Sequence, residues 1–209
     1  MIIKICGIKN KETLLCCEKN NINFFGMIFY KKSPRNIDLQ NAKELQIESK
    51  NLKINGVGVF VNEEIIKIKK YIQELELKFV QLHGNEDANY INELNRSDVK
   101  VIKKISIKNY KDIEKINDFI NADYFLFDYQ PEFNELPGGN ARSFDWNIIK
   151  DFKIDKPWFL SGGVNINNIQ LIKTKINPFG IDLSSGVEKE LGIKDNRIIN
   201  NFLEKFNNA

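Results

Sequence analysis

The chain has 209 residues, of which 42% are hydrophobic and 28% are charged, and its formal net charge is +3. These values are ordinary for a globular protein, and a chain of this length buries enough surface to fold without disulfides or a structural metal. Because acidic residues are interleaved with the basic ones, the sequence lacks the one-signed charge typical of nucleic-acid-binding proteins.

Apolar runs rich in Ile, Val and Phe recur along the whole chain, and each ends at a turn-forming residue such as Gly, Asn or Ser. Runs of this kind predict buried β-strands. Eight are present, at residues 2–6, 24–30, 54–61, 78–84, 99–107, 123–129, 157–163 and 179–186.

Segments with helical periodicity separate these runs, so strand and helix alternate about eight times. They lie at residues 11–20, 38–50, 63–75, 87–96, 110–118, 144–152, 166–174 and 195–206. Eight repeats in a chain of this length predict an α/β fold of the (β/α)₈ TIM-barrel class. A doubly wound open sheet is the alternative, although it typically has fewer strands. No linker-like segment divides the chain, so we expect a single domain over residues 1–209.

The cysteines and the single histidine limit the chemistry. The three cysteines, Cys6, Cys16 and Cys17, form neither a disulfide framework nor a metal-binding spacing, and His83 alone cannot build a multi-histidine site. We therefore expect no metal site built from these residues. The N-terminus lacks the pattern of a signal peptide, and no apolar run approaches the length of a membrane span, so a cytoplasmic protein without a membrane partner is expected.

In a parallel barrel, chemistry gathers at the C-terminal ends of the strands. In chain order, the predicted ends are Cys6, Tyr30, Val61, His83, Ser106, Asp128, Ser161 and Ser184. Of these, Cys6, His83 and Asp128 can transfer protons. A lone histidine at such a place is more often a hydrogen-bonded scaffold residue than a catalyst, and a buried cysteine is often only packing.

The last two strands end in small residues that suit a phosphate group. Gly162 and Gly163 follow the seventh strand, and Ser184, Ser185 and Gly186 follow the eighth. Glycine lets backbone N–H groups approach a ligand closely, and barrels frequently bind phosphate at these two loops. We also expect residues 187–191 to form a short helical turn whose N-terminus faces the anion.

Several stretches carry a resemblance to a known family. They are KICGIKN, FYKKSPR, VQLHGNED, FDYQ, GG before SFDW, LSGGVNINNI, GIDLSSGVE and GIKD, and they run in order from residue 3 to about residue 195. Together they resemble phosphoribosylanthranilate isomerase, an enzyme family of tryptophan biosynthesis. The loop reading GGNARSF departs from the Gly-Thr-Gly type of that family, which leaves open how this loop meets the substrate.

The resemblance implies an Amadori rearrangement of N-(5-phosphoribosyl)anthranilate to 1-(2-carboxyphenylamino)-1-deoxyribulose 5-phosphate, without a cofactor. It implies that Cys6 is the general base, Asp128 the general acid, and Arg35 the ligand of the anthranilate carboxylate. Asp182 and His83 are expected beside the substrate. The partner is thus a small phosphosugar–anthranilate molecule, and the chain is expected to be a monomer or a homodimer.

The residue types suit this chemistry independently of the resemblance. A carboxylic acid can protonate the furanose oxygen, and a thiol with a lowered pKa can remove the C2 proton. Lys4 shares the face of Cys6 in the predicted strand, so we expect its ammonium to lower the pKa of the thiol. The guanidinium of Arg35 can bind a planar carboxylate through two hydrogen bonds.

Other functions remain alternatives. The analogous isomerase of histidine biosynthesis has an aspartate at the end of the first strand, where this chain has Cys6. Indole-glycerol-phosphate synthase needs a lysine and glutamate set and an N-terminal extension that this sequence lacks. A non-catalytic binder of phosphorylated ligands on the same scaffold is the third alternative.

Overall fold

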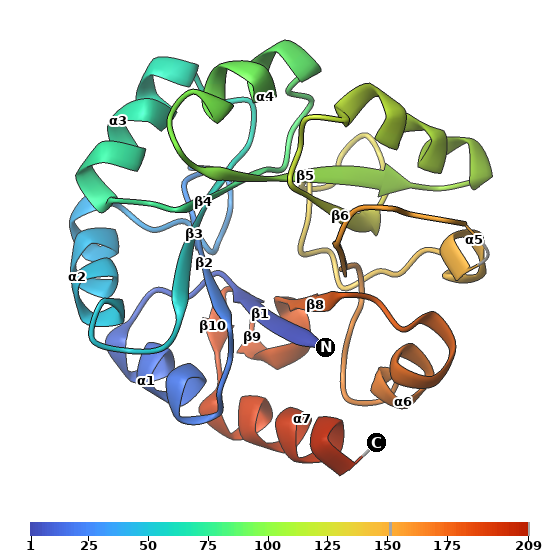
Figure 1. The fold of residues 1–209 in the computed structure, drawn as a ribbon. Helices are drawn as coiled ribbons and strands as arrows, with labels where there is room; N and C mark the ends of the chain where they lie inside the picture. Colours follow the sequence, from blue (N-terminus) through green and yellow to red (C-terminus); the bar gives the residue numbers. More distant parts are fainter. Residues whose placement is uncertain (151, 209) are drawn as a thin grey trace.

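A closed barrel of eight parallel strands forms the centre of the computed structural model, which describes residues 1–150 and 152–208 (Figure 1). Each strand pairs with its neighbour in the sequence, and β8 pairs with β1, so the sheet has no edge. This closure confirms the (β/α)₈ barrel and rules out the open sheet. The strands are β1 (Ile2–Cys6), β2 (Phe24–Ile28), β3 (Asn55–Phe60), β4 (Phe79–Leu82), β5 (Lys100–Ile107), β6 (Tyr124–Tyr129), β7 (Trp158–Leu160) and β8 (Gly180–Leu183).

Helical segments surround the barrel as an outer ring (Figure 1). They are α1 (Lys11–Lys19), α2 (Leu39–Ser49), α3 (Ile65–Leu75), α4 (Ala88–Asn95), α5 (Asn147–Lys150), α6 (Ile169–Leu171) and α7 (Asn196–Asn208). Side chains of Asn10, Asp38 and Asp87 cap α1, α2 and α4 by accepting backbone N–H groups of the first turn. No helix in the described part of the chain is long and apolar enough to cross a membrane.

The second half of the ring departs from the expected regular helices. After β5 the chain forms a 3₁₀ helix, η1 (Tyr110–Phe119), and α6 continues as one turn of π-helix, η2 (Ile172–Ile176). The helix expected over residues 144–152 is reduced to the four residues of α5, and residue 151 lies outside the described residues. The periodic pattern thus predicted where helical segments form better than it predicted their length or type.

The helical turn expected over residues 187–191 is wrong. Instead, a short 3₁₀ turn, η3 (Ser185–Val187), leads into β9 (Glu188–Glu190), which pairs antiparallel with β10 (Ile193–Lys194). Gly192 has a φ of +81°, which lets the chain reverse between the two strands. The Glu188 carboxylate then accepts hydrogen bonds from the Gly192 backbone N–H and from Lys194.

Alternation along the strands sorts side chains into two cores. One core lies between the sheet and the outer helices, and a smaller one fills the barrel with residues such as Phe24, Val57, Ile102 and Phe159. The alternation of β1 directs Cys6 and Lys4 into the barrel, where both side chains are buried. The expected placement of Lys4 beneath the thiol is therefore confirmed.

Candidate functional site

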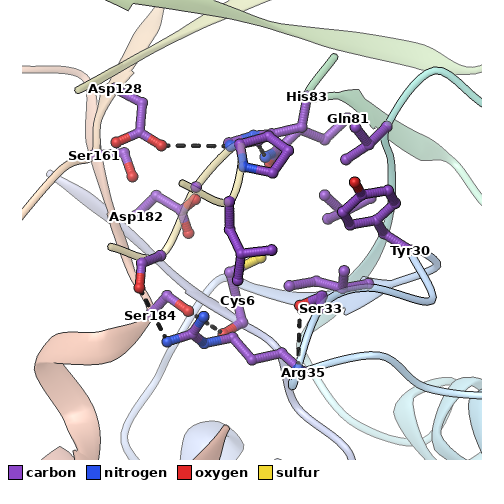
Figure 2. Close-up of a pocket in the computed structure, with 17 residues that line it drawn as sticks. Cys6, Tyr30, Ser33, Arg35, Gln81, His83, Asp128, Ser161, Asp182 and Ser184 are labelled. Carbon is purple, nitrogen blue, oxygen red and sulfur yellow. Dashed lines mark hydrogen bonds and ion pairs between the residues drawn. The ribbon is translucent and has the colours of Figure 1, made fainter. Parts of the chain in front are cut away.

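A pocket of about 530 Å³ opens at the C-terminal ends of the barrel strands. Seven of the eight predicted strand-end residues line it, and Ser106 on β5 is not among its lining residues. Figure 2 shows Asp128 and His83 at one end of the pocket, Cys6 and Arg35 at the other, and Asp182 between them. The expectation that Cys6, His83, Asp128 and Asp182 open on one face of the barrel is confirmed.

At the first end, polar contacts link Gln81 on β4, His83 and Asp128 on β6. Gln81 Nε2 lies 2.8 Å from His83 Nδ1, and His83 Nε2 lies 3.4 Å from an oxygen of Asp128. Since the amide nitrogen can only donate, Nδ1 accepts and the ring proton sits on Nε2, facing Asp128. Burial lowers the pKa of His83, which keeps the imidazole neutral. His83 therefore presents an N–H donor to the carboxyl group of Asp128.

Cys6 occupies the opposite end, where β1 and β2 meet. Its register partner is Gly26, and a Cβ at that position would lie 2.7 Å from the Cys6 sulfur, so the glycine leaves room for the thiol. The Lys4 ammonium lies 3.0 Å from an Asp182 oxygen on the neighbouring β8. Both side chains of this ion pair are buried. The thiol thus lies beside a buried ion pair within the barrel.

The sequence-based expectation for the Cys6 pKa is wrong in its net direction. The ammonium groups of Lys4 and Lys194 do lower the pKa of the thiol, but burial raises it more, and the Asp182 carboxylate adds to the rise. Burial also raises the pKa of Asp182 in spite of its pairing with Lys4. The sequence showed the cation but not the full desolvation of the thiol, and desolvation is the larger effect.

Arg35 reaches the pocket from the loop after β2 and is 2% exposed. Its Nε and Nη2 atoms donate to the two carboxylate oxygens of Glu188, at 2.7 and 2.8 Å, and Nη2 also donates to the Gly139 carbonyl at 3.3 Å. Lys194 Nζ lies 2.6 Å from the same carboxylate and donates to the Ser184 carbonyl at 3.0 Å. The guanidinium is therefore held from the β9–β10 hairpin.

A second pocket of about 370 Å³ adjoins the first at Asp128, Asp182 and Ser184. Four of the five predicted phosphate-binding residues line it: Gly162, Gly163, Ser184 and Ser185. Gly186 is not among the lining residues, although it lies one residue further along. A Cβ at Gly186 would come within 2.2 Å of the Val164 carbonyl oxygen, so the close approach of two loops explains this glycine.

The divergent loop after β6 contacts both pockets. Leu136–Gly139 lines the larger pocket, and residues 138–142 line the smaller one. A Cβ at Gly138 would lie 2.3 Å from His83 Nε2, and a Cβ at Gly139 would lie 2.3 Å from Arg35 Nη1. Lys104 on β5 donates a hydrogen bond of 3.1 Å to the Pro137 carbonyl of this loop. The two glycines let this loop cover the side chains that face the pocket.

Sequence reasoning missed three residues at the site. Gln81 stands two positions before His83, and strand alternation places both on one face. Its Oε1 atom is buried without a hydrogen-bond partner in the described structure, and the side chain lines the pocket. Glu188 and Lys194 lie within the stretches GIDLSSGVE and GIKD, but the hairpin that brings them to Arg35 was not foreseen.

The described residues, 1–150 and 152–208, contain no group of three or more His, Cys, Asp or Glu side chains that could hold a metal ion. The polar groups of the pocket include a thiol, carboxyls, an imidazole and a guanidinium, besides hydroxyl groups and an amide. These groups can transfer protons and bind an anionic ligand.

Comparison with known proteins identifies the family of this chain. The model of the family described as N-(5'-phosphoribosyl)anthranilate (PRA) isomerase matches residues 3–205. The chain belongs to this family. An N-(5'-phosphoribosyl)anthranilate isomerase of Clostridium acetobutylicum is 39% identical over 203 residues, which cover 96% of this chain and 95% of the relative.

Solved isomerases of the family have the same fold over the full length of the chain. The phosphoribosyl anthranilate isomerase of Thermotoga maritima is 32% identical, with a TM-score of 0.89 and complete coverage of both chains. A second structure, of an isomerase in complex with reduced 1-(o-carboxyphenylamino)-1-deoxyribulose 5-phosphate, is also 32% identical over both whole chains, with a TM-score of 0.84.

Proposed function

We propose that this chain isomerises N-(5-phosphoribosyl)anthranilate to 1-(2-carboxyphenylamino)-1-deoxyribulose 5-phosphate in tryptophan biosynthesis, with Asp128 as general acid and Cys6 as general base. Membership of the phosphoribosylanthranilate isomerase family supports the reaction. The observation that supports the residue roles is that Cys6 and Asp128, 122 positions apart in the sequence, line one pocket. The eight strands that carry the site close into one barrel, and we take residues 1–209 as one catalytic domain.

The acid step opens the furanose ring. Asp128 gives its proton to the ring oxygen, the bond between that oxygen and C1 breaks, and the nitrogen lone pair forms an iminium with C1. His83 supports this role because its Nε2–H faces the Asp128 carboxyl group and stabilises the carboxylate that remains. Its neutral state avoids placing a second cation beside the iminium.

The base step follows at C2. The Cys6 thiolate takes the C2 proton, the electrons of that C–H bond form the C1–C2 double bond, and the iminium nitrogen becomes neutral. The resulting enol is the tautomer of the aminoketone product. Because burial raises the pKa of Cys6, the thiol has to pass its proton to water in the open pocket before this step. The adjacent cations Lys4 and Lys194 favour that loss.

The two anionic ends of the substrate fit the two ends of the site. Arg35 supplies the cation for the anthranilate carboxylate, with Nη1 left over from its contacts with Glu188. For the phosphate, we assign Gly162, Gly163, Ser184, Ser185 and Gly186. Support comes from the small side chains of these loops, which leave backbone N–H groups accessible beside the smaller pocket, and from the φ of +77° and +74° at the two glycines.

Turnover tests this proposal. Freshly generated N-(5-phosphoribosyl)anthranilate loses its anthranilate-type fluorescence slowly by itself, and we expect the purified chain to accelerate the change strongly. The matched control is the same protein with both proton-transfer groups removed, Cys6→Ser with Asp128→Asn. Wild-type protein that binds the product but leaves the substrate at its spontaneous rate would be a binder on this scaffold, contrary to the proposal.

A further inference from the structure

Glu188 is a buried carboxylate beside the pocket whose role goes beyond packing. Its side chain is 4% exposed, and it accepts hydrogen bonds from three residues. Arg35 donates through Nε and Nη2, Lys194 through Nζ, and Gly192 through its backbone N–H at 3.2 Å. Four donors therefore converge on the two oxygens of one carboxylate. A carboxylate so fully bonded is held in one position.

The orientation of Arg35 follows from this arrangement. A planar guanidinium bound through Nε and Nη2 cannot rotate about its long axis without breaking both bonds. The remaining donor nitrogen, Nη1, lies on the side of Gly139, where the covering loop passes and where a Cβ would come within 2.3 Å. Because Arg35 also lines the larger pocket, its position there is set from the β9–β10 hairpin.

The charges of the cluster also suit an anion. Arg35 and Lys194 carry two positive charges and Glu188 one negative charge, all on side chains with at most 4% exposure. With all three groups ionised the cluster keeps one net positive charge next to the pocket, although burial lowers the pKa of Lys194. Glu188 offsets most of the cost of burying two neighbouring cations, while the remaining charge attracts a carboxylate.

We propose that Glu188 is a positioning residue that holds Arg35 in the orientation that recognises the anthranilate carboxylate, and thereby makes the site prefer a carboxylated ring. The inference rests on the proposed function, because it takes the substrate and the role of Arg35 from there. Glutamine at position 188 keeps the shape of the side chain, but its amide nitrogen faces N–H donors and cannot accept from them. Arg35 then loses one of its two hydrogen bonds to the side chain at position 188, and the negative charge that faced its guanidinium is gone.

Two ligands that differ only in the carboxylate test this role. Ribose 5-phosphate forms an Amadori product with anthranilate and a matching product with aniline, and the affinity of each is measured by calorimetry. Wild-type protein is expected to bind the carboxylated product more tightly. In Glu188→Gln we expect the affinity for that product to fall about tenfold or more, in line with loss of a charged hydrogen bond, and the affinity for the aniline product to stay within about twofold.

Control variants separate positioning from a general structural effect. Glu190→Gln changes an exposed acid of the same strand and should leave both affinities unchanged. In an Arg35→Met background, Glu188→Gln should cause no further loss for the carboxylated product, since the residue on which Glu188 acts is gone. Glu188→Asp keeps the charge on a shorter side chain and should give an intermediate preference, and it decides the matter if the glutamine variant does not fold.

The outcomes are distinct. Equal losses for both ligands in Glu188→Gln, or an unchanged preference in that variant and in Glu188→Asp, would overturn the role of Glu188 alone. A wild-type protein that binds the two products equally well would contradict the role of Arg35 in the proposed function, and this inference with it.

Discussion

Asp128 and Cys6 line the same pocket but stand in differently built surroundings. Asp128 faces a neutral imidazole, whose N–H lies within reach of the carboxyl group. Cys6 stands among charged groups, with Lys4, Asp182 and Lys194 close enough to act on its pKa. In spite of two cations, the pKa of the thiol is raised, because burial has the larger effect. For a group as buried as the Cys6 thiol, counting neighbouring charges does not predict protonation.

Removing either of the two groups proposed to transfer protons should have the largest effect and should test whether the two ends of the pocket are equally necessary. Cys6→Ser replaces a thiol by a hydroxyl that is too weakly acidic to act as base, and Asp128→Asn removes the transferable proton. We expect each to lose at least ~10²-fold in kcat, as is typical for a general acid or base. Product affinity, measured by calorimetry, should remain near normal. A Cys6→Ser protein with undiminished turnover would return the thiol to a packing role.

A smaller loss of activity is expected from a change at Arg35, which is proposed to bind the anthranilate carboxylate. Arg35→Lys keeps the charge, but a single ammonium cannot reproduce the planar set of donors that binds Glu188 and the ligand. We expect a loss of about 1.5–3 kcal/mol in transition-state stabilisation, measured as kcat/KM and expressed mainly in KM. Lys189→Arg, an exposed change on β9, is the control. A value of kcat/KM equal to wild type would exclude the carboxylate contact.

The sequence predicted the parts of the site that strand alternation and strand ends determine. Cys6, His83 and Asp128 were placed correctly because each stands at or next to the end of a barrel strand and faces inward. Glu188 and Lys194 were not, because the antiparallel pairing of β9 with β10 brings them together beside Arg35, and residues 187–191 were expected to be helical. Residues that act across a sequence separation of 153 positions carry no periodic signal.

The loops proposed to bind phosphate differ from both ends of the larger pocket, because backbone N–H groups rather than side chains are proposed to bind there. Ser185→Ala should therefore raise KM only modestly, since the backbone donor survives the truncation. Gly163→Val should raise KM strongly, because φ is +74° and a Cβ would lie 3.1 Å from the backbone of Arg142. Steady-state kinetics of the two variants checks this, and equal, negligible effects from both would count against the phosphate site.

The pH dependence of activity tests the protonation state of Cys6, the proposed base. Since the pKa of Cys6 is raised, the thiol form dominates at neutral pH, and the thiolate fraction grows as pH increases. We therefore expect kcat/KM to rise with pH through the neutral range, as the thiolate form of the base becomes more populated.

Lys4→Met should shift that rising limb to higher pH. Lys4 has the largest lowering effect on the pKa of Cys6, so its removal raises this pKa further. The substitution also leaves Asp182 without its partner at 3.0 Å. Because burial already raises the pKa of Asp182, this loss favours the protonated carboxyl group. A neutral carboxyl group raises the pKa of Cys6 less than a carboxylate does, so the shift caused by the loss of Lys4 is partly offset. The net result at neutral pH is a several-fold loss of kcat/KM that alkaline pH partly restores, while the exposed change Lys189→Met leaves the profile unchanged. Alkylation of Cys6 by iodoacetamide as a function of pH, corrected with Cys6→Ser for the other two cysteines, should show the same displacement. If the limb and the alkylation midpoint stay where they are in wild type, burial alone sets the protonation of the thiol, and the cations at this end serve only to neutralise the buried carboxylates.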